Sequence, residues 1–207
     1  MKIQKKTKLN VKFNEKAKGV QVVTPRFRVT FPHVYQPTQF EGKGPFNYSC
    51  GMLYDSNIDL SRLEKAISDA KVACFGKDKT KWPECKSPFK DGNDSPYDGY
   101  ADKIVLSAKA LRKPGVIDAD KQPISEESDE FYAGCYARAQ LSCKIQKVKD
   151  EFFECFYLNG IKKIEDGERL GGSFDKDSFD EFSEEDSQGQ DALDDSNDNI
   201  DDDDIGL

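Results

Sequence analysis

The sequence predicts a mainly β fold, an antiparallel sheet with one α-helix, followed by a disordered acidic tail. Three observations support this fold class. Several stretches alternate apolar and polar residues with period two, as strands with one buried face do. Residues 59–74 instead carry apolar residues at helical spacing. Residues 173–207 are rich in Asp and Glu and too poor in apolar residues to form a core of their own.

Charge is unevenly distributed along the 207 residues, whose net charge is −8. Residues 173–207 hold 15 of the 39 acids and one of the 31 bases, so the rest of the chain is basic overall. Residues 1–20 alone contain seven lysines and one glutamate. We therefore expect a basic N-terminal arm or first strand over residues 1–19, a folded domain over 20–172 and a disordered tail over 173–207. Such asymmetry favours contact with nucleic acid.

The first strand pattern covers residues 20–32. Phe27, Val29 and Phe31 alternate with Arg26 and Arg28, which predicts an apolar inner face and a cationic outer face. Turns are expected at the Pro and Gly residues that follow, namely Pro32, Pro37, Gly42, Gly44 and Pro45. Residues 46–54 then resume the pattern of a strand.

The helix is predicted over residues 59–74. Ser61 and Glu64 have the spacing of a capping box at its start, and Gly76 is placed to end it. Residues 77–100 form a long insertion without periodicity, and loops of this length are usually functional or disordered. Its aromatic and lysine side chains are expected to form a flap over a bound single strand of nucleic acid; these are Phe89, Lys90, Tyr97 and Tyr100.

After a strand over residues 103–110 and a basic turn over 112–115, the longest alternating stretch covers residues 130–145. Its odd positions are small or apolar, whereas its even positions include Tyr132, Tyr136, Arg138 and Lys144. Rings on a rigid exposed face can stack on bases, and cations can pair with phosphates. The same residues also occur on sheets that bind no ligand. A turn over 147–150 and a partner strand over 151–158 are expected next, and residues 161–164 finish the domain.

The six cysteines have no close pairs, so we expect reduced thiols in an intracellular protein. Zinc bound by Cys74, Cys85 and other residues remains an alternative, although structural sites usually contain tight pairs. Calcium bound by Asp91, Asn93, Asp94 and Asp98 is a second alternative that fails the EF-hand spacing. We expect no metal and no cofactor. The sequence has no run of eighteen apolar residues and no apolar segment behind its basic start, so we expect no membrane association.

Three segments together resemble a phage single-stranded DNA-binding protein family, formerly known only as a domain of unknown function. They are residues 24–32 (TPRFRVTFP), 131–139 (FYAGCYARA) and 166–172 (DGERLGG). The resemblance covers roughly residues 20–172 and includes the loop 87–92 (SPFKDG). It implies an oligonucleotide-binding (OB) fold, an antiparallel barrel that coats single-stranded DNA during phage replication or recombination. Residues 147–150 depart from the family, whose members often have Asn and Gly at this turn.

The resulting hypothesis is a sequence-independent single-stranded DNA-binding protein without catalytic activity. It would act in the cytoplasm of an infected bacterial host, where it coats and protects DNA, with homo-oligomerisation left open. The residues expected to bind DNA are Arg26, Arg28, Lys109, Arg112, Tyr132, Tyr136, Arg138 and Lys144. By similarity, the tail tip resembles the acidic tips with which bacterial single-stranded DNA-binding proteins recruit replication enzymes. Its partner-binding residues would be Asp201, Asp202, Asp203, Asp204, Ile205 and Leu207.

Two other functions are alternatives to this hypothesis. A metal-dependent nuclease would use the acids of residues 91–98, but the chain has a single histidine and no evident pairing of nucleophile and base. An acidic adaptor would use its tail to mimic nucleic acid and occupy a basic partner. Strand annealing is a role close to the leading hypothesis, and the sequence does not distinguish it from simple binding.

Overall fold

The computed structural model describes residues 13–40 and 42–171. The strands are β1 (Val20–Val23), β2 (Phe27–Phe40), β3 (Lys43–Asp55), β4 (Cys85–Lys86), β5 (Phe89–Asp91), β6 (Lys103–Ala110), β7 (Gly115–Ile117), β8 (Tyr136–Val148) and β9 (Glu151–Glu165). The helix α1 (Ser61–Phe75) lies between β3 and β4, and short 3-10 turns η1 (Lys79–Lys81) and η2 (Gly92–Asp94) lie before and after the β4–β5 segment.

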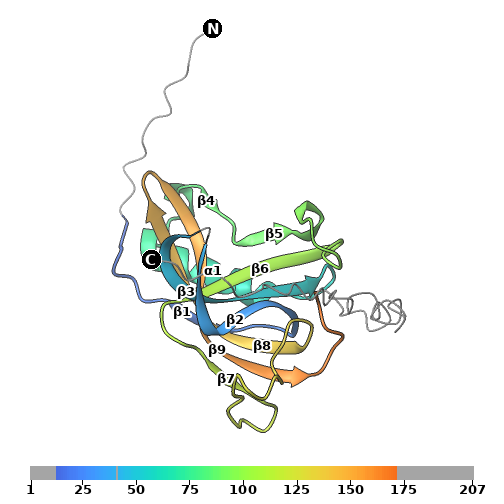
Figure 1. The fold of residues 1–207 in the computed structure, drawn as a ribbon. Coiled ribbons are helices and arrows are strands. Elements are labelled where there is room, and N and C mark those ends of the chain that lie inside the picture. The colour runs from blue at the N-terminus through green and yellow to red at the C-terminus, as the bar shows by residue number, and fades with distance from the viewer. Residues whose placement is uncertain (1–12, 41, 172–207) are drawn as a thin grey trace, which may run out of the picture. The chain divides into compact units, whose positions relative to one another are not determined.

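Five strands close into a barrel in the order β2, β3, β6, β9, β8 and back to β2 (Figure 1). Neighbouring strands are antiparallel except β6 and β9, which run parallel where Lys109 pairs with Tyr157. A five-stranded Greek-key barrel of this kind is the OB-fold. The predicted fold class, a mainly β OB-like barrel with one helix, is therefore confirmed for the described residues.

The helix α1 covers one side of the barrel by packing on β1 and β8. Its buried residues Leu63, Ala66, Ile67, Ala70 and Cys74 form the predicted apolar stripe. Lys71 on the same helix forms an ion pair with Glu154, a carboxylate on the inner face of β9 that is nine-tenths buried. Because a buried charge is costly without a partner, this pair ties the helix to the barrel in one arrangement.

The start of α1 differs from the sequence prediction, whereas its end agrees. Leu60 occupies the N-cap and makes no side-chain hydrogen bond, so the predicted capping box of Ser61 and Glu64 is wrong. The Asp59 carboxylate instead accepts a hydrogen bond from the Ser61 backbone N–H at 2.9 Å. Gly76 ends the helix with a φ of 88°, as predicted.

The predicted turns at Pro32 and Pro37 are wrong, because both residues lie inside β2. This distal half of β2 pairs with β3 alone, since β8 contacts β2 only at Phe27 and Arg28. A strand with one unpaired edge tolerates proline, which has no N–H to donate to a neighbour.

The predicted strand over residues 130–145 begins later, at Tyr136, and residues 131–135 form a loop. Gly134 causes the break: its φ is 113°, and an added Cβ would meet the Glu168 carbonyl oxygen at 2.0 Å. From Tyr136 onward the alternation holds, with Ala137, Ala139 and Leu141 buried. A two-residue turn at residues 149–150 leads into β9, which joins the two predicted segments 151–158 and 161–164 in one strand.

Residues 77–100 are more ordered than the sequence indicates. Their β4 pairs with β9 beside the β8–β9 turn, and their β5 pairs with β6 at the edge of the barrel. At the N-terminus, residues 13–19 form no strand, and the Phe13 ring packs 5.3 Å from the Phe152 ring. Residues 1–12 and the whole predicted tail lie outside the described residues. Within the described ranges, no helix has the length and apolar character needed to cross a membrane.

Candidate nucleic-acid interface

A β-bulge in β2 turns one aromatic side chain out of the barrel. Thr30 pairs with Gly51 and His33 pairs with Ser49, so β2 holds one residue more than β3 over this interval. The extra residue lets Phe31 adopt a φ of 43° and leaves its side chain 47% exposed. The expectation that Phe31 shares the inner face with Phe27 and Val29 is therefore wrong. Bulges often re-aim a side chain in this way beside a functional site.

Phe31 faces a groove on the outer surface of β3 and β6, which we call the aromatic groove. Its volume is about 630 Å³, within the range of ligand-binding clefts. Its lining includes aromatic rings, hydroxyls and charged groups: Phe31, Phe89, Tyr97, Tyr100, Thr30, Ser49, Ser95, Ser107, Lys90, Lys109, Asp91 and Asp94. Strands β3 and β6 are the second and third strands of the barrel, and the corresponding face of OB-folds binds oligonucleotides.

The floor of the aromatic groove is open because its residues are small. Gly51 on β3 lies opposite Ser107 on β6, and Ser49 lies opposite Lys109. A Cβ at Gly51 would meet Thr30 Oγ1 at 2.2 Å and the Thr30 carbonyl oxygen at 3.0 Å, so the missing side chain at Gly51 makes room for Thr30 of β2. Beside it, the small side chains of Ser49 and Ser107 keep the floor low.

One wall of the groove is built by residues 91–100 and is held by local hydrogen bonds. The Asp91 carboxylate accepts from the Asn93 backbone N–H at 2.9 Å, and the Asn93 side-chain oxygen accepts from the Asp102 N–H at 3.1 Å. The Tyr97 ring, which is 54% exposed, lies edge-on to the Phe31 ring with 5.0 Å between centroids. The two rings thus contact each other edge to face, and each keeps about half of its surface exposed for stacking on a base.

Tyr100 was expected in an exposed flap, but it is only 6% exposed and lies beneath Tyr97 at 5.5 Å between ring centroids. Burial raises the pKa of its phenol, and the neighbouring Thr30 offsets part of that rise. Phe89 is half-buried and packs on Phe156. The predicted mobile flap is therefore a wall packed on the sheet, and Tyr97 is its exposed aromatic ring.

The outer face continues from the groove across β9 to β8. Lys109 pairs with Tyr157 of β9, and Cys155 of β9 pairs with Lys144 of β8. Burial raises the pKa of the Cys155 thiol, and the Lys109 charge beside it acts in the opposite direction. Lys144 borders a second depression together with Phe13, Lys147 and Tyr157. Lysines therefore line this face at two places, about two strand spacings (~10 Å) apart.

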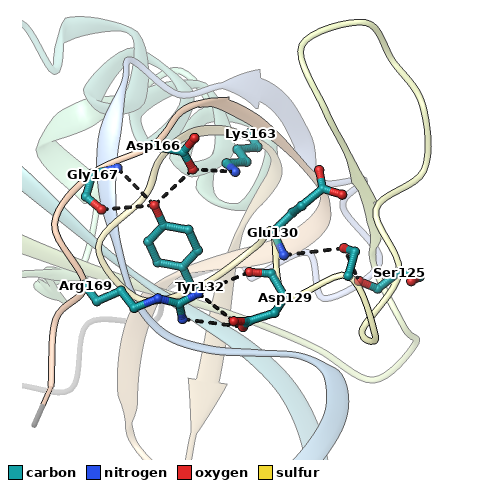
Figure 2. Close-up of polar contacts among 9 residues, drawn as sticks. Ser125, Asp129, Glu130, Tyr132, Lys163, Asp166, Gly167 and Arg169 are labelled. Atoms are coloured by element: carbon teal, nitrogen blue, oxygen red, sulfur yellow. Dashed lines mark hydrogen bonds and ion pairs between the residues drawn. The ribbon is translucent and has the colours of Figure 1, made fainter. Parts of the chain in front are cut away.

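Tyr132 lies elsewhere, in the loop before β8, and its contacts are internal (Figure 2). Its hydroxyl donates to Asp166 Oδ1 or the Gly167 carbonyl oxygen, each at 3.0 Å, and accepts from the Gly167 N–H at 3.2 Å. The Arg169 guanidinium lies 4.1 Å from the ring centroid and the Lys163 ammonium 5.4 Å from it. The prediction that Tyr132 lies on the polar face of a strand is wrong.

The ions around Tyr132 neutralise one another. Arg169 pairs with Asp129 at 2.6 Å, and Lys163 pairs with Asp166 at 2.7 Å. The hydrogen bond from Lys163, followed by that from Tyr132, lowers the pKa of the Asp166 carboxyl. Burial lowers the pKa of Lys163, but the Asp166 partner outweighs it and leaves that pKa raised. We call this set the Tyr132 network, comprising Asp129, Tyr132, Lys163, Asp166, Gly167 and Arg169.

Arg26 and Arg28 adjoin the Tyr132 network and are also engaged. Arg26 pairs with Glu165, and its guanidinium carbon lies 3.7 Å from the centroid of the Tyr136 ring. Arg28 is half-buried and donates to the Glu168 carbonyl oxygen at 2.7 Å and to the Gly134 carbonyl oxygen at 3.4 Å. These contacts close the barrel by holding the loop before β8 and the segment after β9 against β2.

Comparison with known proteins identifies the family. A family model described as the single-stranded DNA-binding protein of Enterobacter phage Enc34 matches residues 20–193. This chain belongs to that family. The membership predicted from three sequence segments is thereby confirmed. The family is described by DNA binding rather than by a catalytic reaction.

A relative of this chain is the protein named p50 of Acyrthosiphon pisum secondary endosymbiont phage 1. It is 28% identical over an alignment of 172 residues, with coverage of 75% of this chain and 90% of the relative. The Enc34 protein solved in complex with single-stranded DNA is 21% identical with a TM-score of 0.62, covering 79% of this chain and 99% of that one. The gp2.5 single-stranded DNA-binding protein of bacteriophage T7 is 14% identical with a TM-score of 0.53, covering 81% and 97%. At these identities the structures establish a shared fold.

The structure distributes the predicted DNA-binding residues of this Enc34-type chain over several places. Lys109 lines the aromatic groove together with the predicted flap residues. Arg112 is exposed beyond the end of β6, and Arg138 is exposed on β8 opposite Lys162. Tyr136 lies under Arg26, and Lys144 lies by the second depression. The predicted partner-binding residues, Asp201 to Asp204, Ile205 and Leu207, lie outside the described residues.

Sequence reasoning missed Phe31 and the groove floor. The floor left a signal in the sequence, because Ser49, Gly51 and Ser107 are small residues at outward positions of two strands. Phe31 left none, since its outward direction depends on the register between β2 and β3. Among the described residues, no three His, Cys, Asp or Glu side chains are grouped so that they could hold a metal ion.

Proposed function

We propose that this chain binds single-stranded DNA in the aromatic groove, largely independently of sequence. One observation carries the proposal: Phe31 and Tyr97, each about half exposed, pack edge to face beside small residues on the face that OB-folds use for oligonucleotides. Stacking on either ring accepts any base, because every base has a π face. Such a surface binds single-stranded DNA in preference to duplex DNA, because the bases of a duplex are stacked on each other and are unavailable.

Lys109 supplies the backbone contact in this proposal. None of the ion pairs among the described residues engages it, whereas Arg26, Lys103 and Arg169 each have a carboxylate partner. A lysine without a carboxylate partner can release a counterion from a phosphate at little cost. Lys144 extends the basic surface across β9 and β8, so the strand can leave the groove in that direction.

The biological role we infer is that of a coat on single-stranded DNA during phage replication or recombination, in the cytoplasm of the infected bacterium. Family membership and the resemblance to the phage T7 protein support this inference. The acidic tip, which includes Asp201 to Asp204, Ile205 and Leu207, would recruit replication or recombination enzymes through a small basic-rimmed pocket on the partner. Its run of acids ending in apolar residues supports that role.

The experiment is an equilibrium titration of the full chain with oligo-dT and with a duplex of equal length. We expect clearly tighter binding of the single strand, with a Kd that rises with salt as counterion release requires. Equal or tighter binding of the duplex would overturn the proposal. A cleavage assay on both substrates with magnesium tests the competing nuclease function, for which we expect intact DNA.

A further inference from the structure

The two charged residues that border only the aromatic groove have opposite signs and lie on different elements. Lys109 belongs to β6, whereas Asp94 ends the turn η2 in the wall formed by residues 91–100. The remaining charged residues of the groove, Lys90 and Asp91, also border a neighbouring depression beside α1. The groove is therefore electrostatically two-sided.

This polarity orients a bound strand. A phosphate beside the Asp94 carboxylate would be repelled, whereas a phosphate beside Lys109 is attracted. A backbone that follows β6 past Lys109 would leave a base stacked on the exposed Tyr97 ring with its edge free to approach Asp94. Tyr97 is three residues from Asp94, and its backbone N–H is held by the Ser95 hydroxyl at 3.4 Å, so ring and carboxylate belong to one turn.

Asp94 is free to contact such a base edge. The Asp91 carboxylate is committed to its own turn, where it accepts from both the backbone N–H and the side-chain amide of Asn93 at 2.9 Å. In the described part of the chain, the Asp94 side chain takes no part in a turn of this kind and forms no ion pair.

The floor supplies a second polar group. Thr30 is 3% exposed, lines the groove, and its Oγ1 makes no hydrogen bond of ordinary geometry within the described ranges. This hydroxyl packs against Gly51 and beside the Tyr100 phenol, so it helps to hold the groove wall on the sheet. The Asp94 carboxylate is then the exposed acceptor on the wall.

An ionised carboxylate can only accept hydrogen bonds. The edge of cytosine presents an amino group, as does that of adenine, whereas thymine presents a carbonyl oxygen at the same position. We propose that Asp94 accepts a hydrogen bond from the amino group of the base held in the aromatic groove, so that this site favours cytosine and adenine over thymine. The inference rests on the proposed function and adds a base preference to a binding mode that otherwise accepts any sequence.

The test measures Kd for short oligo-dC and oligo-dT at mildly alkaline pH with three full-length proteins. These are the wild type, Asp94→Ala, and Asp98→Ala, a control that removes an exposed acid from the same segment but outside the groove lining. The readout is the change in the ratio of the two affinities, because intrinsic differences between the oligonucleotides cancel. We expect the preference for oligo-dC over oligo-dT to fall about threefold to tenfold in Asp94→Ala and to stay unchanged in the control.

Each other outcome overturns the inference. If Asp94→Ala tightens binding of both oligonucleotides equally, the carboxylate only repels the backbone. If the ratio does not change, Asp94 contacts no base edge. Failure of the wild type to bind either oligonucleotide would instead contradict the proposed function, so the two failures are distinguishable. Circular dichroism of the three proteins verifies that they share one fold.

Discussion

The aromatic groove and the Tyr132 network contain the same kinds of residue and differ in what is left unsatisfied. Each combines aromatic rings with Lys and Asp, and the Tyr132 network also includes Arg169. In the Tyr132 network the hydroxyl, the ring and each cation have a partner within the protein. In the groove two rings remain about half exposed, and Lys109 has no ion-pair partner among the described residues.

Composition alone therefore does not identify a nucleic-acid interface. Aromatic and basic residues at alternate positions can form a DNA-binding face, but they can equally form internal contacts that hold a loop against a strand. What distinguishes the two is whether each polar group and ring face is already used by the fold, because an occupied group must break one contact before it gains another. Substitutions in the Tyr132 network should therefore change stability, whereas substitutions in the groove should change DNA affinity.

The largest effect is expected for Tyr132→Ala, which removes a half-buried ring and a hydroxyl with three hydrogen-bonding contacts. The loop before β8 and the segment after β9 then lose one of the contacts that hold them together. We expect a loss of about 3 kcal/mol in the free energy of unfolding, or a melting temperature lower by roughly 6–12 °C. Oligo-dT affinity per folded molecule should hold. A stable variant with weakened DNA binding would show that Tyr132 is a stacking residue after all.

Phe31→Ala should have the opposite signature. Loss of one stacking platform should weaken oligo-dT binding by ~1–3 kcal/mol, with little change in melting temperature because the ring is half exposed. Phe46→Ala is the matched control, since that ring is 60% exposed but lies outside the groove lining. Equal losses of affinity in the two variants would mean that the groove has no special role.

The cations should differ in the salt dependence of binding. Lys109→Ala should reduce the log–log slope of affinity against salt by about 0.7, the value for one phosphate contact on a single strand. Arg26→Ala should leave the slope unchanged, because Arg26 pairs with Glu165 and covers Tyr136. The salt slope of Arg138→Ala tests the sequence prediction that Arg138, which is exposed on β8, contacts a phosphate. The slopes come from titrations at four or more salt concentrations, and a reversed order of Lys109 and Arg26 would contradict the contrast drawn here.

Much of the barrel could be predicted from the sequence, because alternation directly reports a half-buried strand. The strand β6 covers residues 103–110 as predicted, and the even positions of β8 after Tyr136 are exposed except Ser142. The candidate site was harder to predict from the sequence. Phe31 faces out because of a bulge, and Tyr132 is buried by residues more than thirty positions later in the chain. Both depend on pairing between distant segments, which no local pattern contains.

The smallest effect is expected from changes in the acidic tail. These changes test whether the tail competes with DNA for the aromatic groove. Residues 174–182 intersperse three phenylalanines with four acids, an alternation of flat apolar groups and negative charge like that of a nucleic acid strand. The described chain ends at Gly171. Leu170 lies beside Gly99 of the groove wall, because a Cβ added at Gly99 would be 3.9 Å from Leu170 Cδ2.

A tethered segment has a high effective concentration, so even a weak contact can compete with DNA. Truncation after Gly172 should therefore raise oligo-dT affinity a few-fold at low ionic strength, and the gain should fade as salt screens the charges. Removal of residues 201–207 alone should change affinity less, because those residues lack the aromatic rings. Titrations of the three proteins at two salt concentrations check this. Identical affinities at low salt would restrict the tail to solubility or partner recruitment and leave the groove open to DNA alone.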